Sequence, residues 1–155
     1  MSKMCDHTSV GMFIWKENKL LLIERGREPF GYAVPAGHVD DDTTFEAAAI
    51  RELEEETGLQ TESIELLTEG RKNNPCRREG GSWHFWKLYT IISKGEINPS
   101  KIETKRIGWY SVDEIKNFAI RTDNFLKGKI SDSLWEEAPG LEPVMYEWFK
   151  ELGIL

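Results

Sequence analysis

The sequence is poor in cysteine, has no excess of positive charge and contains no long apolar run. Two cysteines among 155 residues are too few for a disulfide framework, so we expect a reducing, cytoplasmic location. No apolar stretch approaches the ~20 residues that a membrane helix needs, and the N-terminal residues lack the apolar segment of a signal peptide. A membrane partner is therefore not expected.

The negative balance of charge also limits the possible partners. The net charge of −7 argues against broad nucleic-acid binding, which requires a basic surface. It leaves room for a phosphorylated small molecule, because a bound divalent cation can reverse the local field of an acidic protein.

What the sequence does contain is a series of short strand patterns around one strong helix pattern. Alternating and β-branched residues predict strands, and helical periodicity with capping residues predicts helices. The expected strands cover 8–15, 19–25, 62–72, 82–93 and 105–111, with an extended segment at 32–39, and the expected helices cover 43–57, a segment from 111 and 142–153. We expect the first two strands to form a hairpin. The order indicates one α+β domain over residues 1–155, with a mixed sheet between helices.

The end of the helix predicted at 43–57 is crowded with acids, where the helix dipole disfavours them. Relative to Glu52, Glu55 lies at about −60° and Glu56 at about +40°, so these three carboxylates share one face, whereas Glu54 points away. Hard oxygen ligands that converge on one point suit Mg²⁺ or Mn²⁺. A charged, solvated helix surface is the alternative, since like charges three or four residues apart cost only ~0.2–0.5 kcal/mol per pair.

Two apolar regions are expected to be buried. Leu53 and Ile50 flank the acidic face and are expected to meet the core. The C-terminal residues 145–155, MYEWFKELGIL, either pack on the sheet of the same subunit or form the contact of a homodimer.

The segment 37–59, GHVDDDTTFEAAAIRELEEETGL, resembles the Nudix box, G-x5-E-x7-R-E-U-x-E-E-x-G-U, where U is a bulky aliphatic residue. Every fixed position agrees except the first glutamate, which is Thr43 here. The resemblance continues in FGYAVPAGH and IGWYSVDEI, so it covers about residues 8–118. It implies a Nudix-type α/β/α sandwich.

The replacement at Thr43 affects the start of the helix. In the family the first glutamate mainly supports the loop and helix. Thr43 with Glu46 could form a capping box, whereas the family register places the cap at Thr44.

The resemblance also implies a reaction, in which water cleaves a diphosphate bridge in a nucleoside diphosphate linked to another group. Glu52, Glu55 and Glu56 would hold Mg²⁺, with Mn²⁺ as the alternative ion and the Gly37 carbonyl as a further ligand. Arg51 would orient a catalytic glutamate, although a surface ion pair is the alternative role. Some relatives take the general base from a loop before the later tryptophan, which favours Glu103. The base differs among members, so Glu55 and Glu56 are alternatives.

Substrate contacts are expected from a basic cluster and from aromatic residues near the box. Arg71, Arg77 and Arg78, with Lys72, flank the loop at 73–81, where they could meet phosphates. Pro75 follows Leu59 at the offset that the family associates with ADP-ribose pyrophosphatases. Among the aromatic residues that could stack on a base, which include Phe30, Trp83 and Phe85, we favour Tyr32.

Other activities remain open at this point. A nucleotide sensor without turnover would suit the loss at Thr43, and an isoprenoid diphosphate isomerase would need further catalytic residues that the sequence does not reveal. RNA decapping receives no special support from the acidic composition. Residue types that can bind zinc occur at Cys5, His7, Cys76 and His84, but their spacing matches no common zinc pattern.

Overall fold

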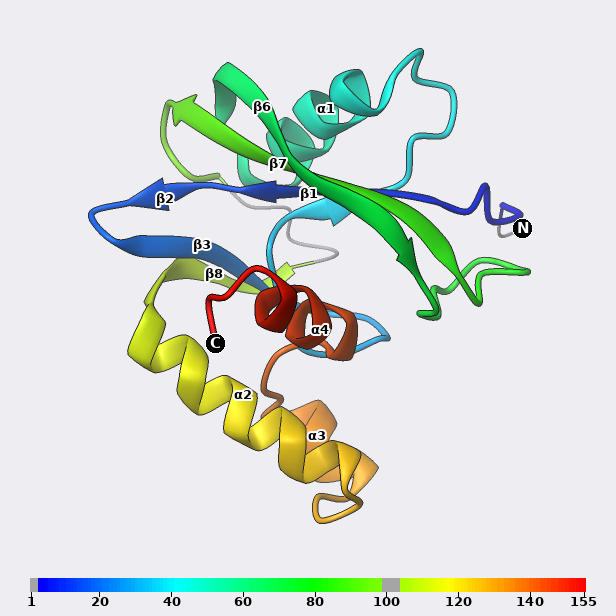
Figure 1. Ribbon diagram of the computed structural model, residues 1–155, viewed down its shortest axis with the longest axis vertical. Helices are drawn as coiled ribbons and strands as arrows, with labels where there is room; N and C mark the ends of the chain where they lie inside the picture. The colour runs from blue at the N-terminus through cyan, green and yellow to red at the C-terminus, as the bar shows by residue number, and fades with distance from the viewer. Residues whose placement is uncertain (1–2, 99–103) are drawn as a thin grey trace.

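The computed structural model describes residues 3–98 and 104–155 and divides the chain among short strands and helices (Figure 1). The strands are β1 (Thr8–Phe13), β2 (Trp15–Lys16), β3 (Lys19–Arg25), β4 (Tyr32–Ala33), β5 (Ala36–Gly37), β6 (Gln60–Lys72), β7 (His84–Lys94) and β8 (Thr104–Ser111). The helices are α1 (Phe45–Thr57), α2 (Val112–Leu126), α3 (Asp132–Glu137) and α4 (Pro143–Glu151). None of the helices that the structure describes has the length and apolar character needed to cross a membrane.

The strands form two sheets rather than the one that the sequence suggested. The first has the order β5-β1-β7-β6 and is mixed, because β1 runs parallel to β7 while the other pairs are antiparallel. In the second sheet β3 pairs with β2, β4 and β8. The expected hairpin is confirmed only between β2 and β3, where Glu17 and Asn18 have the positive φ angles of a tight turn. The chain leaves the first sheet after β1, so the segment 8–15 is not one strand.

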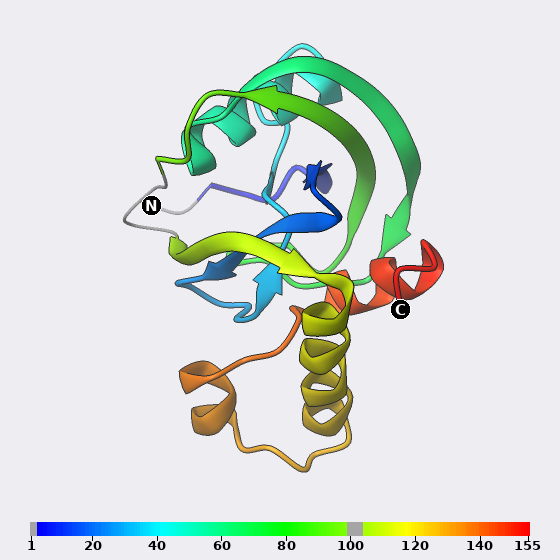
Figure 2. The same ribbon diagram turned by 90° about the vertical axis from the view of Figure 1, so that its left-hand side faces the viewer.

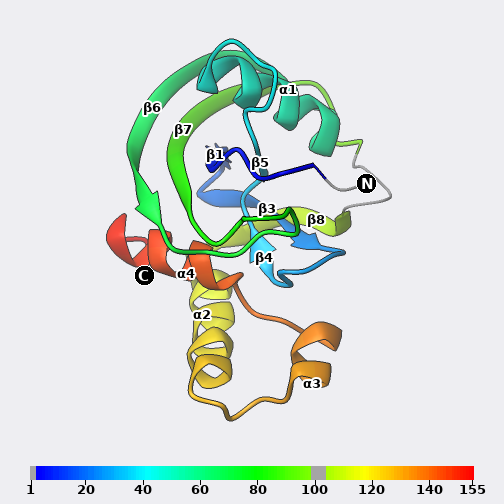
Figure 3. The same cartoon turned by 90° about the vertical axis from the view of Figure 1, so that its right-hand side faces the viewer.

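The two faces of the strands carry two separate cores. Val10, Met12 and Leu21 face α1, whereas Phe13, Leu20 and Leu22 belong to the cluster that includes residues of α2 and α4. This division follows from the alternation of side chains along a strand. Helix α1 lies on one side of the strands and α2 on the other (Figures 2 and 3). The predicted α+β class and α/β/α arrangement are confirmed.

Helix α1 begins and ends as the box predicts. The Thr44 side chain accepts a hydrogen bond from the Ala47 amide at 3.0 Å, and Gly58 ends the helix at φ 79°. Leu53 is fully buried, but Ile50 is 40% exposed, so the prediction that Ile50 meets the core is wrong. The buried stripe passes through Ala49 and Leu53, which lie four residues apart, and Ile50 lies about 100° away from Ala49.

Helix α4 packs on the sheet of its own subunit. Phe149 is fully buried and meets Phe13 edge to face at 5.8 Å between ring centroids. We expect Phe149→Ala to lower the free energy of unfolding by about 3–5 kcal/mol, because it removes a large core side chain and leaves a cavity. Urea unfolding measures this change. Ile120→Ala, at a position 62% exposed on α2, is the control, with an expected change within about 0.5 kcal/mol. Equal effects of the two substitutions would contradict the packing of α4.

Candidate functional site

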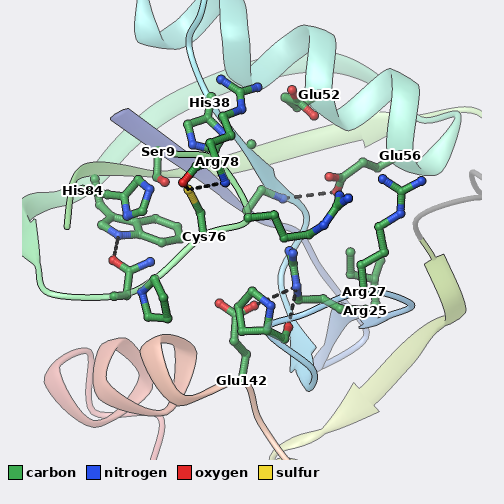
Figure 4. Close-up of a pocket in the computed structure, with 18 residues that line it drawn as sticks. Ser9, Arg25, Arg27, His38, Glu52, Glu56, Cys76, Arg78, His84 and Glu142 are labelled. Carbon is green, nitrogen blue, oxygen red and sulfur yellow. Dashed lines mark hydrogen bonds and ion pairs between the residues drawn. The ribbon is translucent and has the colours of Figure 1, made fainter. Parts of the chain in front are cut away.

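A cavity of about 240 Å³ lies between α1, the ends of β3 and β5, the loop after β6 and the start of α4 (Figure 4). Its lining combines acidic, basic and aromatic side chains with backbone of the box loop. The lining includes Arg25, Arg27, Gly37, His38, Glu52, Glu56, Asn74, Pro75, Cys76, Arg77, Arg78, His84, Trp86 and Glu142. This is the place where the acidic face of α1 meets the basic residues of other segments.

The acidic wall is formed by two of the three predicted metal ligands. Glu52 and Glu56 project from α1 into the cavity (Figure 4). Glu56 is 7% exposed, and its carboxylate accepts a hydrogen bond from the Ala36 amide at 3.2 Å. Gly37 lies so close to Glu52 that an added Cβ would come within 2.2 Å of Glu52 Cδ. Two carboxylates and a glycine backbone thus share a small volume, and their hard oxygen atoms fit a divalent cation such as Mg²⁺.

Arg51 connects this wall to the loop before α1. Its guanidinium donates to Asp42 Oδ2 at 2.8 Å, Glu52 Oε1 at 3.0 Å, Glu55 Oε2 at 3.1 Å and the His38 carbonyl at 3.2 Å. The same nitrogen contacts both glutamates, so Glu55 lies beside Glu52 although it is exposed and outside the cavity lining. Arg51 therefore has the position of an orienting residue.

The structure resolves how the helix starts without the family's first glutamate. Thr44 is the cap, as the family register predicts, and Thr43 is not. Asp42 provides a carboxylate partner for Arg51 one residue earlier in the chain. An acidic support of the box loop is thus present in this protein from a neighbouring position.

The basic wall includes two predicted residues and two that sequence reasoning missed. Arg77 and Arg78 line the cavity, together with Arg25 and Arg27 from the end of β3. Arg25 and Arg27 are the two arginines of the motif ERGR, and their position directly before a loop is the feature of the sequence that could have identified them. Guanidinium groups bind phosphate oxygens with two parallel hydrogen bonds, so this wall suits a diphosphate. Arg71 is outside the lining and lies over the Trp83 ring at 4.3 Å.

The aromatic side chain in the lining of the cavity is not the one that the sequence favoured for stacking on a base. Tyr32 is buried in the core, with its ring stacked on Phe118 at 4.2 Å, and is not brought into the cavity. Trp86 lines it instead and donates a hydrogen bond to Asn74 Oδ1 at 3.0 Å. Glu103, the predicted general base, lies outside the described residues.

A second hollow, of about 380 Å³, adjoins the first and shares Pro29, Pro75 and Arg77 with it. It is more aromatic, because Phe30 and Trp135 line it. The Trp135 ring is stacked on Phe125 at 4.1 Å, which fixes its orientation. The first hollow is thus lined by glutamates and arginines, and the second adds aromatic side chains beside it.

Glu142 brings the C-terminal part of the chain to the cavity. This buried carboxylate contacts Arg25 at 3.2 Å. Burial raises its pKa above 4.5, and Arg25 only partly opposes this effect. The folded protein therefore holds the Glu142 proton more tightly than the unfolded chain does.

This difference predicts how stability depends on pH. Above pH 4.5 the unfolded chain loses the Glu142 proton first, so the free energy of unfolding falls as the pH rises through the folded pKa. Glu142→Gln removes this contribution, which is at most about 1.4 kcal/mol per pH unit. Urea unfolding of both proteins between about pH 4.5 and 8 measures it. Parallel pH profiles for the variant and the native protein would contradict the prediction.

Comparison with known proteins agrees with the resemblance to the Nudix box. Residues 6–130 match the family model of the NUDIX domain. The ADP-ribose pyrophosphatase of Methanocaldococcus jannaschii is 47% identical over 123 residues, which cover 77% of this chain and 70% of that protein. The NAD-capped RNA hydrolase NudC of Photobacterium profundum is 31% identical over 110 residues, which cover 67% of this chain.

Two of the relatives are longer than the matched region. The match covers only 37% of the length of NudC and 26% of the length of a nudix hydrolase from Caenorhabditis elegans. Among solved structures, a MutT NUDIX hydrolase from Burkholderia pseudomallei superposes with a TM-score of 0.61 at 27% identity. That alignment covers 69% of this chain and 84% of the other.

Proposed function

This chain belongs to the Nudix hydrolase family, and we propose that it cleaves the diphosphate of ADP-ribose or a closely similar molecule, releasing AMP and ribose 5-phosphate. The observation that carries the proposal is the division of one cavity into two walls. Glu52, Glu56 and Gly37 form an acidic wall that suits a divalent cation, and arginines line the same cavity. A diphosphate between these walls would be neutralised from both sides.

The choice of substrate is supported by the relative and by the shape of the site. The 47% identical archaeal relative is an ADP-ribose pyrophosphatase. Pro75, at the offset associated with that activity, lines both hollows. Phe30 in the second hollow provides a flat surface on which an adenine ring could stack, next to the arginines that would hold the diphosphate.

Glu52, Glu55, Glu56 and the Gly37 carbonyl are the proposed ligands of Mg²⁺, with Mn²⁺ as the alternative ion. Such an ion, when bound, polarises phosphoryl oxygens and lowers the pKa of water. Two of these side chains line the cavity, and Arg51 holds Glu55 beside them. Carboxylate oxygens are the donor type that both ions prefer.

The remaining residues would bind and orient the substrate. Arg25, Arg27 and Arg77 would contact phosphate oxygens, while Arg51 keeps Glu52 and Glu55 oriented. Glu103 stays the sequence-based choice for the proton acceptor. If Glu103 is the proton acceptor, its protonation lowers the rate at low pH, so Glu103→Gln should lose the acidic limb of the pH–rate profile of kcat/KM.

A substrate panel tests the proposal. The protein is incubated with Mg²⁺ and ADP-ribose, nucleoside triphosphates, dinucleoside polyphosphates or nucleotide sugars, and the products are separated by chromatography. We expect AMP and ribose 5-phosphate from ADP-ribose, at the highest kcat/KM of the panel, and no products when EDTA is present. Tight binding of ADP-ribose in calorimetry without any turnover would instead identify a sensor.

A further inference from the structure

A second cluster of ligand-type side chains lies at the edge of the cavity and is made of Cys5, His38, Cys76 and His84. One ligand atom from each residue lies within 4.8 Å of the other three. Figure 4 shows His38, His84 and Cys76 together on one side of the cavity, away from Glu56. Three of the four were recognised in the sequence as zinc-type residues, but the fourth is His38 and not His7.

The four residues come from separate segments that the fold brings together. Cys5 precedes β1, His38 follows β5, Cys76 lies in the loop after β6, and His84 begins β7. The amides of Cys5 and Cys76 donate to the carbonyls of Glu79 and Gly81, each at 2.8 Å. Backbone hydrogen bonds therefore hold both cysteine segments in place next to the histidines.

The distances between ligand atoms match those around a tetrahedral zinc ion. Cys5 Sγ lies 3.4 Å from His84 Nε2 and 3.7 Å from His38 Nε2. Bonds of about 2.3 Å to sulfur and 2.0–2.1 Å to nitrogen at tetrahedral angles place such atoms about 3.6 Å apart. The two imidazole rings are inclined at 64°, so they approach the common centre from different directions.

A backbone amide contacts each sulfur atom, while burial raises the pKa of the Cys5 thiol, so metal binding there would displace a proton. The His7 amide donates to Cys5 Sγ at 3.3 Å, and the Arg78 amide donates to Cys76 Sγ at 3.4 Å. Each cysteine thus receives a hydrogen bond from the amide two residues later. Hydrogen bonds to the charged form stabilise it, and such outer contacts orient metal-bound ligands.

Each histidine of the cluster presents its Nε2 atom to Cys5 Sγ. The His84 side chain is 1% exposed, whereas His38 is half-buried at the edge of the cavity. Two sulfur and two nitrogen atoms form a softer donor set than the glutamates of α1, so the two sites suit different ions.

We propose that Cys5, His38, Cys76 and His84 bind one structural zinc ion. With four protein ligands the site is closed, which is typical of structural zinc rather than of catalytic zinc. Both cysteines are free in the structure and available as ligands. The ion would tie the segment before β1 to the loop after β6 and, through His38, to the loop that presents Gly37.

Metal analysis of the intact protein tests the proposal independently of any hydrolysis of ADP-ribose. The protein is expressed with added zinc, dialysed in Mg²⁺ buffer and analysed by plasma mass spectrometry. We expect about one zinc ion per chain, and less than about a tenth of that in Cys76→Ser and His84→Asn. His7→Asn is the matched control, because it changes the one histidine outside the cluster and should keep the zinc.

Cobalt provides a second measurement that does not depend on variants. After removal of zinc with a chelator, Co²⁺ added to the native protein should give the visible bands of a tetrahedral, thiolate-ligated ion, and the chelated protein should melt at a lower temperature. A native protein without zinc and without these bands would overturn the proposal. So would a Cys5–Cys76 disulfide in freshly purified protein, or full zinc content in Cys76→Ser.

Discussion

Glu56→Gln should lower kcat/KM for ADP-ribose about 1,000-fold while leaving the fold intact, because it removes a charged metal ligand without changing the shape of the side chain. The Ala36 amide now donates to the Glu56 carboxylate at 3.2 Å, and the amide oxygen of glutamine can accept the same hydrogen bond. The loss of activity would therefore come from the missing negative charge of the Glu56 carboxylate. Steady-state kinetics at saturating Mg²⁺, with circular dichroism of the variant, measures it.

Glu54→Gln is the matched control on the same helix. Glu54 is exposed, and its position about 200° from Glu52 turns it away from the cavity. The kcat/KM of Glu54→Gln should stay within about twofold of the native value, because the Glu54 side chain touches neither metal nor substrate in the proposed site. If Glu54→Gln and Glu56→Gln lost activity equally, the helix phase on which the site is built would be wrong.

Gly37→Ala should lower kcat/KM about 100-fold, although it adds only one methyl group. That methyl group would lie 2.2 Å from Glu52 Cδ and 2.5 Å from Glu52 Oε1. Because these atoms are at the end of a flexible side chain, the protein can relieve the clash by moving the carboxylate. We expect the free energy of unfolding to change by less than about 1 kcal/mol while the metal ligand is displaced.

Gly70→Ala separates this effect from a general effect of added volume. A Cβ at Gly70 would meet one atom of Trp148 at 3.6 Å, which is an ordinary contact. Its activity should be close to native. The pair is compared by kinetics and by urea unfolding, and a large loss of stability in Gly37→Ala, sufficient to explain its lost activity, would refute the displacement of Glu52.

Local signals in the sequence were sufficient for most elements. The end of α1 at Gly58 and the shared face of Glu52 and Glu56 follow from helix geometry within one short segment. The division into two sheets was missed, because it depends on which strands pair, and β1 pairs in parallel with β7, more than seventy residues later. Alternation along a strand predicts its faces but not its neighbours.

The same distinction explains the residues of the site that were missed. Arg25, His38 and Glu142 each occur in unremarkable local sequence, and only tertiary packing brings them to one cavity. Tyr32 lies close to the box in sequence, yet its ring belongs to the core, since β4 is a buried strand. Proximity along the chain was a poor guide to proximity in the site.

Tyr32 joins β4 to the segment before α4 through its backbone. Its amide donates to the Gly140 carbonyl at 2.8 Å, and its own carbonyl accepts from the Glu142 amide at 2.9 Å, so the segment before α4 is fastened beside the strand that leads to Gly37. This segment and Trp135 lie beyond residue 130, where the family match ends. The two hollows are thus assembled from both sides of this boundary: Glu52, Glu56 and Gly37 lie within the matched residues, while Glu142 and Trp135 come from beyond them.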